Sequence, residues 1–485
     1  MDTGSSMDEE TSPKPEPSLE GQDVGPKQAT SYSNTLDFSG KRILSLALPA
    51  LGALIIEPLL VLIDSVMVGH LGTVELAGLS LASTILMTLV GVFVFLAYST
   101  TALTARALGA GNRAAGIRGG IEAMWLAFGL GVILVILLLA TAPWIVSAMG
   151  ADPQVAPEAI IYLRAGSFGM IGMLVILAAS GTLRGLLDMR TPLYVLAAGS
   201  ILNVLLNLLL IFGLHLGIMG AGIGLSIAQN LMATAMVWRV VVGAREHGVA
   251  LRPSGVGVLA SAKDGMPLFI RTVSLRAALL ATVAVATAAG TFALAGHQVV
   301  NSIWGMTAFA IDALAIAAQG LVGVAIGAGQ QSQLRVLVRR LTIWGLGSAV
   351  VLGGVIAALS PWLPMMFGTS TDMHQVASRA LLVAGLLMPI SGVAFVLDGV
   401  LIGASEGRYL AKFGVVTLLL YLPALGALYW WIHENAPLDV AQQSTSLMWL
   451  WVAFAGWFIL VRALANAARA FSPHLGEVET ATPTT

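Results

Sequence analysis

A series of long apolar runs constrains this chain more than any other feature of its sequence. The runs begin just after Lys41 and continue almost to the C-terminus. A helix of about 20 apolar residues is long enough to cross about 30 Å of hydrocarbon. We therefore predict twelve membrane-spanning helices and a polytopic, all-α membrane fold. Their approximate spans are 43–68, 76–106, 120–142, 158–182, 192–213, 219–242, 264–288, 294–326, 336–359, 376–402, 410–432 and 446–468.

Composition supports a membrane protein and excludes several other classes. Only 10% of the 485 residues are charged and 57% are hydrophobic, whereas soluble domains carry about 25% charged residues. A net charge of −1 excludes a broadly basic nucleic-acid binder. The chain has no cysteine, which excludes a disulfide scaffold, a thiolate metal site and a cysteine nucleophile.

The two ends of the chain differ from its apolar middle. Residues 1–40 hold eight acidic residues and few large apolar ones, so we predict a disordered cytoplasmic tail there. Residues 472–485 are interpreted in the same way. With the N-terminus inside, 20 of the 24 basic residues, Arg462 among them, fall on the inner side. This bias predicts cytoplasmic termini, and we expect a multi-pass protein of the plasma (inner) membrane.

The apolar region repeats itself at an offset of 218 residues. Pro49 matches Pro267 and Gly109 matches Gly327, and further landmarks coincide without a gap. We infer two six-helix bundles of equal topology, an N-lobe at 41–242 and a C-lobe at 263–471. A cytoplasmic loop at 243–262 joins them. Parallel repeats are related by an axis along the membrane normal, as in alternating-access transporters.

No sequence motif indicates catalysis or a resident cofactor. The chain has no His-rich box, no paired-His spacing and no nucleophile elbow, so we expect a transporter rather than an enzyme, with no metal site.

A charge within the bilayer is costly and therefore suggests function. In the C-lobe, two arginines and two acids can pair with one another as a structural network. These are Arg271, Arg276, Asp312 and Asp398. In the N-lobe, Glu122 lies near the inner end of the third span, where we expect it to reach the membrane interface.

Two acids of the first span have no basic partner in the N-lobe membrane region. Glu57 and Asp64 are seven residues apart and share a helix face. A buried carboxylate without a counter-charge must take up a proton or hold a cation. Asn203 and Asn207 lie on one face of the fifth span at the depth of Asp64, so we predict a coupling site for H⁺ or Na⁺. The same amides can alternatively serve only to join helices.

Two prolines of the first span are candidate points of movement. Pro49 and Pro58 lie within this span and are expected to kink or loosen the helix.

Four segments resemble the multidrug and toxic compound extrusion (MATE) transporters. Residues 57–72 (EPLLVLIDSVMVGHLG) resemble the first-helix motif of that family, and residues 184–192 (RGLLDMRTP) resemble its loop between helices four and five. Segments 312–319 and 398–403 resemble its DinF branch. The resemblance covers about residues 40–470.

This resemblance implies export of small amphipathic, often cationic compounds, driven by inward flow of H⁺ or Na⁺. It implies that Asp64 is the principal ion site and that Asn203 and Asn207 surround it. Many relatives carry Asp at the position of Asn207, which favours H⁺ here. The hydroxyl expected on the sixth helix falls near Leu225, and a basic residue expected before Gly327 is replaced by Val324.

The remaining predictions concern the substrate and the alternatives. We expect a monomer that binds its substrate in a cleft between the lobes. Candidate cleft residues are Met67, Met87, Tyr98, Trp125, Asn301 and Trp304; helix packing is the alternative role for each. A lipid-linked oligosaccharide flippase and a channel or membrane scaffold remain alternative functions.

Overall fold

The computed structural model describes Met1 and residues 39–476, and these form an all-helical fold. The first half contains α1 (Gly40–Gly69), α2 (Thr73–Val92), α3 (Phe95–Gly109), α4 (Arg113–Ala148), α5 (Val155–Ser167), α6 (Gly169–Gly185), α7 (Arg190–Asn207), the π-helical η1 (Leu208–Gly213) and α8 (Gly217–Glu246). The second half contains α9 (Gly255–Ala288), α10 (Thr291–Gly327), α11 (Gln331–Leu359), the 3₁₀ helix η2 (Leu363–Phe367), α12 (Thr371–Gly403), α13 (Gly407–Asn435), α14 (Val440–Trp451), the π-helical η3 (Val452–Phe458) and α15 (Ile459–Ala470).

The twelve predicted membrane spans are confirmed within the described residues. Eleven segments are individually long and apolar enough to cross a membrane. The twelfth span is the pair α5 and α6, which bends by 48° at Phe168. The second span is also interrupted, because α2 ends at Val92 and α3 begins at Phe95.

Helix packing repeats at the same offset as the sequence. A Cβ atom added to Gly181 of α6 would lie 2.5 Å from the Ala97 carbonyl oxygen, and one added to Gly399 of α12 would lie 2.3 Å from that of Ala315. Each residue of the first pair is 218 positions before its counterpart in the second pair. Glycine therefore allows the same close helix contact in both lobes.

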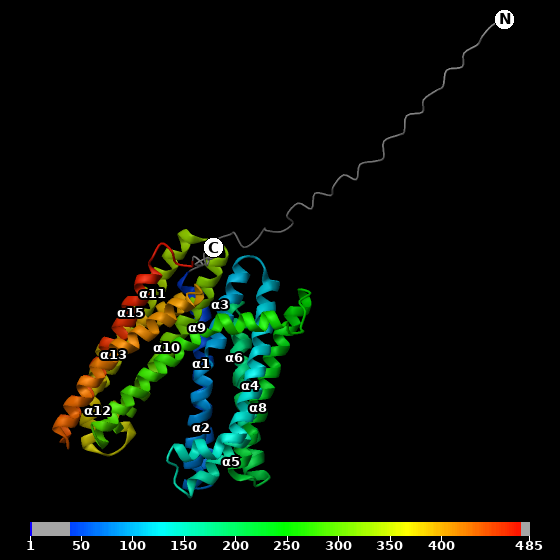
Figure 1. Cartoon of the computed structure of the whole chain (residues 1–485). Helices are drawn as coiled ribbons and strands as arrows, with labels where there is room; N and C mark the ends of the chain where they lie inside the picture. The colour runs from blue at the N-terminus through cyan, green and yellow to red at the C-terminus, as the bar shows by residue number, and fades with distance from the viewer. Residues whose placement is uncertain (2–38, 477–485) are drawn as a thin grey trace.

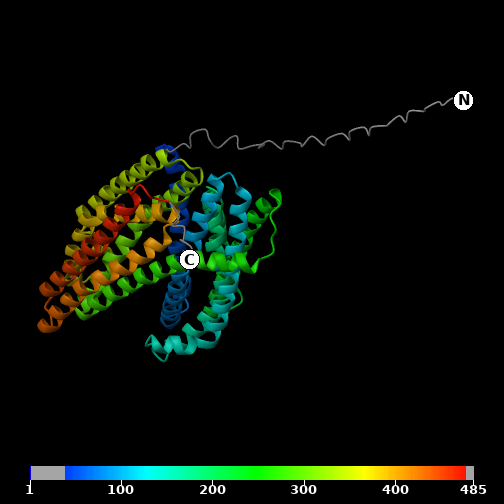
Figure 2. The same cartoon turned by 45° about the horizontal axis from the view of Figure 1, so that its top comes forward.

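The two lobes meet at the end of the molecule where α1 begins and α15 ends, and they spread apart at the opposite end (Figures 1 and 2). Close approaches across this junction join α3 to the C-lobe. A Cβ added to Gly323 of α10 would lie 2.6 Å from Ala105 Cβ, and one added to Gly265 of α9 would meet the Phe95 ring at the same distance. Arg106 also donates to the Ala404 carbonyl oxygen.

The connection between the lobes is shorter than the predicted loop at 243–262. Helix α8 extends to Glu246 and α9 begins at Gly255, so residues 247–254 form the non-helical linker. Glu122 of α4 is buried with 3% of its surface exposed. Its carboxylate accepts from the Ser254 amide at 3.1 Å and from the Ser254 hydroxyl at 2.9 Å, and it pairs with Arg118. Glu122 therefore holds the linker against α4.

The ends of the chain lie mostly outside the described residues. Of the predicted N-terminal tail at 1–40, only Met1, Ser39 and Gly40 are described, and α1 begins at Gly40. Of the predicted C-terminal tail at 472–485, residues 472–476 are described. They form turns in which Leu475 is buried and the Gly476 amide donates to Glu406. This part of the second tail is packed against the C-lobe, contrary to the disorder predicted for it.

Candidate functional site

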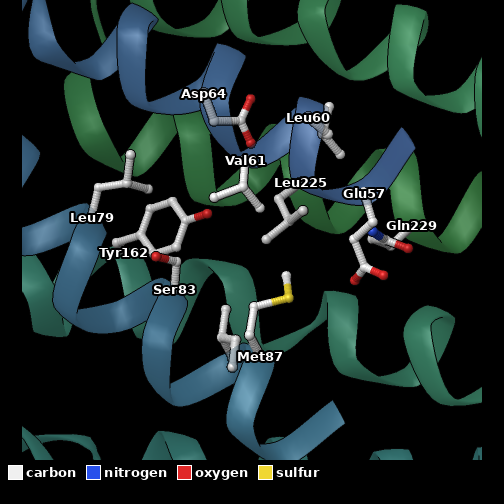
Figure 3. Close-up of a pocket in the computed structure, with 11 residues that line it drawn as sticks. Glu57, Leu60, Val61, Asp64, Leu79, Ser83, Met87, Tyr162, Leu225 and Gln229 are labelled. Carbon is white, nitrogen blue, oxygen red and sulfur yellow. The ribbon is translucent and has the colours of Figure 1, made fainter. Parts of the chain in front are cut away.

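A small cavity in the N-lobe contains the two predicted acids of α1. The space open to the centre of a water molecule measures about 20 Å³, and one water requires about 10–15 Å³ on this measure. Its lining comes from α1, α2, α5 and α8 (Figure 3). The lining residues are Glu57, Leu60, Val61, Asp64, Leu79, Ser83, Leu86, Met87, Tyr162, Leu225 and Gln229. The cavity therefore suits a single water or a small ion, not an organic compound.

Asp64 is buried at the centre of an amide network. Only 6% of its surface is exposed, and Asn207 Nδ2 donates to its Oδ1 at 2.8 Å. The Asn203 amide is oriented so that both its nitrogen and its oxygen form hydrogen bonds. Its nitrogen donates to the same Asp64 oxygen at 3.0 Å, and its oxygen accepts from the Leu225 backbone amide at 3.3 Å. The structure thus brings Asp64 together with Asn203 and Asn207, which lie 139 and 143 residues further along the chain.

Local backbone geometry makes room for this network. Asn207 is the last residue of α7 before the π-helical turn η1. A Cβ added to Gly224 of α8 would lie 2.2 Å from Asn207 Oδ1, so glycine is required there for α8 to pack against the amide. Asn207 Oδ1 is itself buried without a hydrogen-bond partner in the described part of the chain.

Glu57 lies about two turns before Asp64 on α1 and borders the same cavity (Figure 3). Unlike Asp64, Glu57 is exposed. The two predicted hinge residues, Pro49 and Pro58, both lie inside α1, which continues through them as one helix. Since proline has no backbone N–H, each removes one hydrogen bond from this helix.

The same contact occurs in the C-lobe without a charge. Asp64 and Asn203 correspond, at the offset of 218, to Thr282 and Tyr421. The hydroxyl groups of these two residues are 2.8 Å apart and hydrogen-bonded. The position of Asn207 corresponds to Leu425. The same helix–helix contact therefore includes a carboxylate in the N-lobe and only neutral groups in the C-lobe.

The charged residues of the C-lobe form a different arrangement, centred on Asp398 of α12. Its carboxylate pairs with Arg271 of α9 and with Arg462 of α15. Asn466 also donates to Asp398 Oδ1 at 2.6 Å. Sequence reasoning expected the first of these arginines but assigned Arg462 to the inner face. That residue lies close to the end of its apolar run, and only the packing of α15 against α12 reveals its partner.

A second cavity opens in the C-lobe, facing three residues of the N-lobe, and we call it the C-lobe cavity. The space open to the centres of water molecules measures about 220 Å³, which is about eleven times that of the N-lobe cavity. N-lobe residues on its border are Gly91, Val94 and Tyr98. The C-lobe residues include Arg271, Arg276, Trp304, Asp312, Phe395, Asp398, Phe454, Phe458 and Arg462.

Three of the six candidate cleft residues border one of these two cavities. Met87 borders the N-lobe cavity, and Tyr98 and Trp304 border the C-lobe cavity. The other three border neither. Met67 is buried in α1, Asn301 is partly buried in α10, and Trp125 donates its indole N–H to the Leu251 carbonyl of the linker.

Among the described residues, no group of three or more His, Cys, Asp or Glu is placed to hold a metal ion.

Comparison with known families matches both halves of the chain. The MatE family model matches residues 49–209 and again residues 267–425. The two matches begin at Pro49 and Pro267, so they follow the internal repeat.

Relatives and solved structures agree with this match. The chain is 32% identical over 387 residues to Protein DETOXIFICATION 44, chloroplastic, of Arabidopsis thaliana, covering 77% of this chain and 73% of that protein. It is 29% identical over 437 residues to DNA damage-inducible protein F of Escherichia coli, covering 85% and 93%. The crystal structure of the Vibrio cholerae MATE transporter VcmN in its bent form superposes with a TM-score of 0.78 at 19% identity, covering 90% of this chain and 98% of that one.

Proposed function

The chain belongs to the MatE family of multidrug and toxic compound efflux transporters, and from this premise we propose that it is a proton-coupled antiporter that exports small amphipathic compounds by alternating access. Family membership makes it a multi-pass membrane transporter rather than an enzyme. The observation that supports proton coupling is the buried pairing of Asp64 with Asn207.

The asymmetry between the lobes supports a specific role for Asp64. A carboxylate away from water is costly unless it is paired or protonated. The equivalent C-lobe contact uses Thr282 and Tyr421, so this architecture can be stabilised by neutral groups. A carboxylate in the N-lobe is therefore not required by the fold, and reversible protonation gives it a function.

The charge of the site favours H⁺ over Na⁺. Asn203 and Asn207 are neutral amides that hydrogen-bond to Asp64. One proton neutralises a single buried carboxylate. Asp64 is also the single acid among these three residues.

In the proposed cycle, the outward-facing protein takes up a proton at Asp64. Protonation removes the charge that the two amides stabilise and weakens their hydrogen bonds to it. Helix α1 then rearranges near Pro49 or Pro58, where its hydrogen bonding is already incomplete. The N-lobe changes shape and the compound is released outward. Return to the inward-facing state delivers the proton to the cytoplasm.

We further propose that both termini are cytoplasmic, that the protein lies in the plasma membrane and that it acts as a monomer. The inner bias of the basic residues supports this orientation. In this orientation the lobes spread apart toward the outside (Figure 1). A single chain contains both lobes and both cavities, which supports a monomeric unit.

We do not propose a cationic substrate, although the sequence led us to expect one. The C-lobe cavity is the larger of the two cavities, and its bordering arginines outnumber its acids.

Transport by reconstituted protein tests the proposal. Proteoliposomes would be given separate H⁺ and Na⁺ gradients, and export of a panel of dyes of both charges would be followed. We expect the H⁺ gradient to drive export and Asp64→Asn to abolish it while the protein remains folded. Asp372→Asn, which removes an acid outside both cavities, is the matched control. Full gradient-driven export by the Asp64→Asn variant would refute the proposed coupling site.

A further inference from the structure

The arginines of the C-lobe cavity exceed what its acids neutralise. Three arginines, Arg271, Arg276 and Arg462, border it together with two acids, Asp312 and Asp398. Two of the arginines pair directly with Asp398 and lie within electrostatic reach of Asp312. These four groups balance one another, so the remaining positive charge belongs to the third arginine.

That third arginine, Arg276, has no acidic partner. It forms no ion pair and no hydrogen bond with any other residue in the described part of the chain. It is exposed where it borders the cavity, and its guanidinium packs against Gly91 of α2 in the opposite lobe. A Cβ atom added to Gly91 would lie 2.2 Å from Arg276 Nη2. The unpaired charge therefore lies between the lobes, beside the cavity.

The fold itself does not require the charges around this cavity. At the offset of 218, the N-lobe counterparts of Arg271, Asp398 and Arg462 are Ala53, Ser180 and Ala244. The N-lobe forms the same helix arrangement with these small neutral residues. The counterparts of Asp312 and Arg276 are likewise uncharged, a valine and a proline. A structural role common to both lobes therefore does not explain these charged residues. Their explanation must be a property that is specific to the C-lobe cavity.

Aromatic rings form part of the wall of the cavity. Trp304 packs edge-on against Phe395 and Phe454, with ring centroids 5.7 Å and 5.4 Å apart. All three residues border the cavity. Cavities for organic ligands typically join apolar walls of this kind to a few polar groups, which here are the arginines.

Asp398, one of the two acids on the border, is poorly placed to attract a cation, and Asp312 lies within electrostatic reach of two of the arginines. Asp398 already accepts hydrogen bonds from Arg271 and Asn466 and pairs with Arg462. A cation entering the cavity would meet these arginines as well as the unpaired Arg276. In a partly desolvated site, like charges repel strongly and opposite charges attract strongly.

We propose that the C-lobe cavity binds an organic anion, a carboxylate or sulfonate carried on an aromatic or similarly apolar body, with Arg276 pairing its charge. The rings of Trp304, Phe395 and Phe454 contact the apolar body. This inference rests on the proposed function, since it names the chemical class of the exported compound.

Binding to the purified full-length transporter in neutral detergent tests this directly. The probes are 2-naphthoate and 2-naphthyltrimethylammonium, which share a ring system and carry opposite charges, and calorimetry gives each Kd. We expect naphthoate to bind about tenfold more tightly than the cation, a typical effect of one close charge pair. Cation binding as tight as naphthoate binding, or tighter, would overturn the proposal.

Variants assign the preference to Arg276. Arg276→Gln should weaken naphthoate binding by about tenfold and leave the cation no weaker, whereas Arg276→Lys should retain the preference. Arg379→Gln, an exposed arginine of the same lobe that borders neither cavity, is the matched control and should bind like the parent. Unchanged naphthoate binding in Arg276→Gln would overturn the assignment.

Two further measurements distinguish this anion site from a lipid site and from the coupling site. An anionic lipid shares the same chemistry, so phosphatidylglycerol is added to the micelles. Full displacement of naphthoate would assign the site to lipid and overturn the proposal. Gradient-driven export is measured in proteoliposomes made from the same preparation. Naphthoate binding without gradient-driven export would refute the proposed antiporter but not the anion site. Gradient-driven export without naphthoate binding would refute the anion site but not the antiporter.

Discussion

Gly109 of the N-lobe packs against the Val324 carbonyl of the C-lobe, and Gly327 packs in return against the carbonyl of Arg106. A Cβ atom added to Gly109 would lie 2.1 Å from Val324 O, and one added to Gly327 would lie 2.0 Å from Arg106 O. The offset of 218 residues converts one contact into the other. The lobes therefore meet through a pseudo-twofold backbone contact that only glycine permits.

Replacing Gly327 by alanine should force the lobes apart at this junction. Overpacking a tight contact costs about 1–3 kcal/mol, so we expect lower thermal stability and a longer distance between the lobe ends. The measurement is electron–electron resonance between nitroxides at Asn112→Cys and Gln331→Cys, which label specifically because the chain has no cysteine. Gly347→Ala is the control, since a Cβ there meets nothing within 4 Å. An unchanged distance distribution would contradict the prediction.

Adding a second acid beside Asp64 should change the ion that drives transport. In Asn207→Asp, a carboxylate oxygen replaces the amide N–H that now donates to Asp64 at 2.8 Å. Two carboxylates favour a bound cation, so we expect a Na⁺ gradient to drive export in this variant and not in the parent. Flux in proteoliposomes under an imposed Na⁺ gradient is the measurement. Asn435→Asp, on the exposed end of α13, is the control, and Na⁺-driven flux in the parent would disprove this interpretation.

The C-lobe counterpart of this contact should matter for stability and not for coupling. Tyr421→Phe removes the hydroxyl that bonds Thr282, and we expect a loss of about 0.5–1.5 kcal/mol in unfolding free energy. The dependence of export on the H⁺ gradient should be unchanged, because neither residue is an acid. Thermal unfolding and flux on the same preparation check both statements. Loss of gradient dependence with normal stability would show that the C-lobe takes part in coupling.

Glu122 should determine how firmly the linker at 247–254 is held. Its carboxylate accepts from the Ser254 backbone and side chain and pairs with Arg118. Glu122→Gln weakens these charge-assisted bonds, and we expect a loss of about 1–3 kcal/mol and faster proteolysis within the linker. Glu246→Gln, an exposed acid at the end of α8, should leave the cleavage rate at that of the parent. Equal rates in the two variants would indicate that the linker is held by other contacts.

Removing Asp398 should destabilise the protein more than removing Arg462. Asp398→Asn leaves Arg271 and Arg462 buried without their shared carboxylate, and an uncompensated buried charge costs about 3–5 kcal/mol. Arg462→Met leaves Asp398 paired with the remaining arginine, and the methionine side chain fills most of the vacated space, so the cost should be smaller. Denaturation midpoints in the same detergent compare the two. A larger loss in Arg462→Met would contradict this charge assignment.

Much of the fold was predictable because each membrane helix corresponds to one continuous apolar run in the sequence. The length of each apolar run is set by the thickness of the hydrocarbon layer, and the repeat is visible by aligning the chain with itself. The grouping of Asp64 with Asn203 and Asn207 was also predictable, since position along a span of known direction gives depth in the membrane. The bend at Phe168 was not predicted, because the run at 158–182 contains no proline to mark a break in the helix.

The charged sites of the other lobe were only partly predictable. Arg462 lies near the end of its span and is indistinguishable in sequence from an arginine at the membrane surface. The binding of the linker by Glu122 was likewise not predicted. In both cases the partner lies on another helix or loop. Contacts of this kind join residues far apart in the chain, so no regular spacing in the sequence reveals them.

The sequence by itself determined the spans, their number, the duplication and the position of Asp64 inside the first span, because each of these depends on residue type along the chain. Only the tertiary structure decided which arginines share Asp398, that Arg276 remains unpaired beside Gly91, and that the larger cavity lies in the C-lobe. These properties depend on how the helices are rotated and tilted against one another. That packing balances contacts among many helices, and no single helix contains the information that determines it.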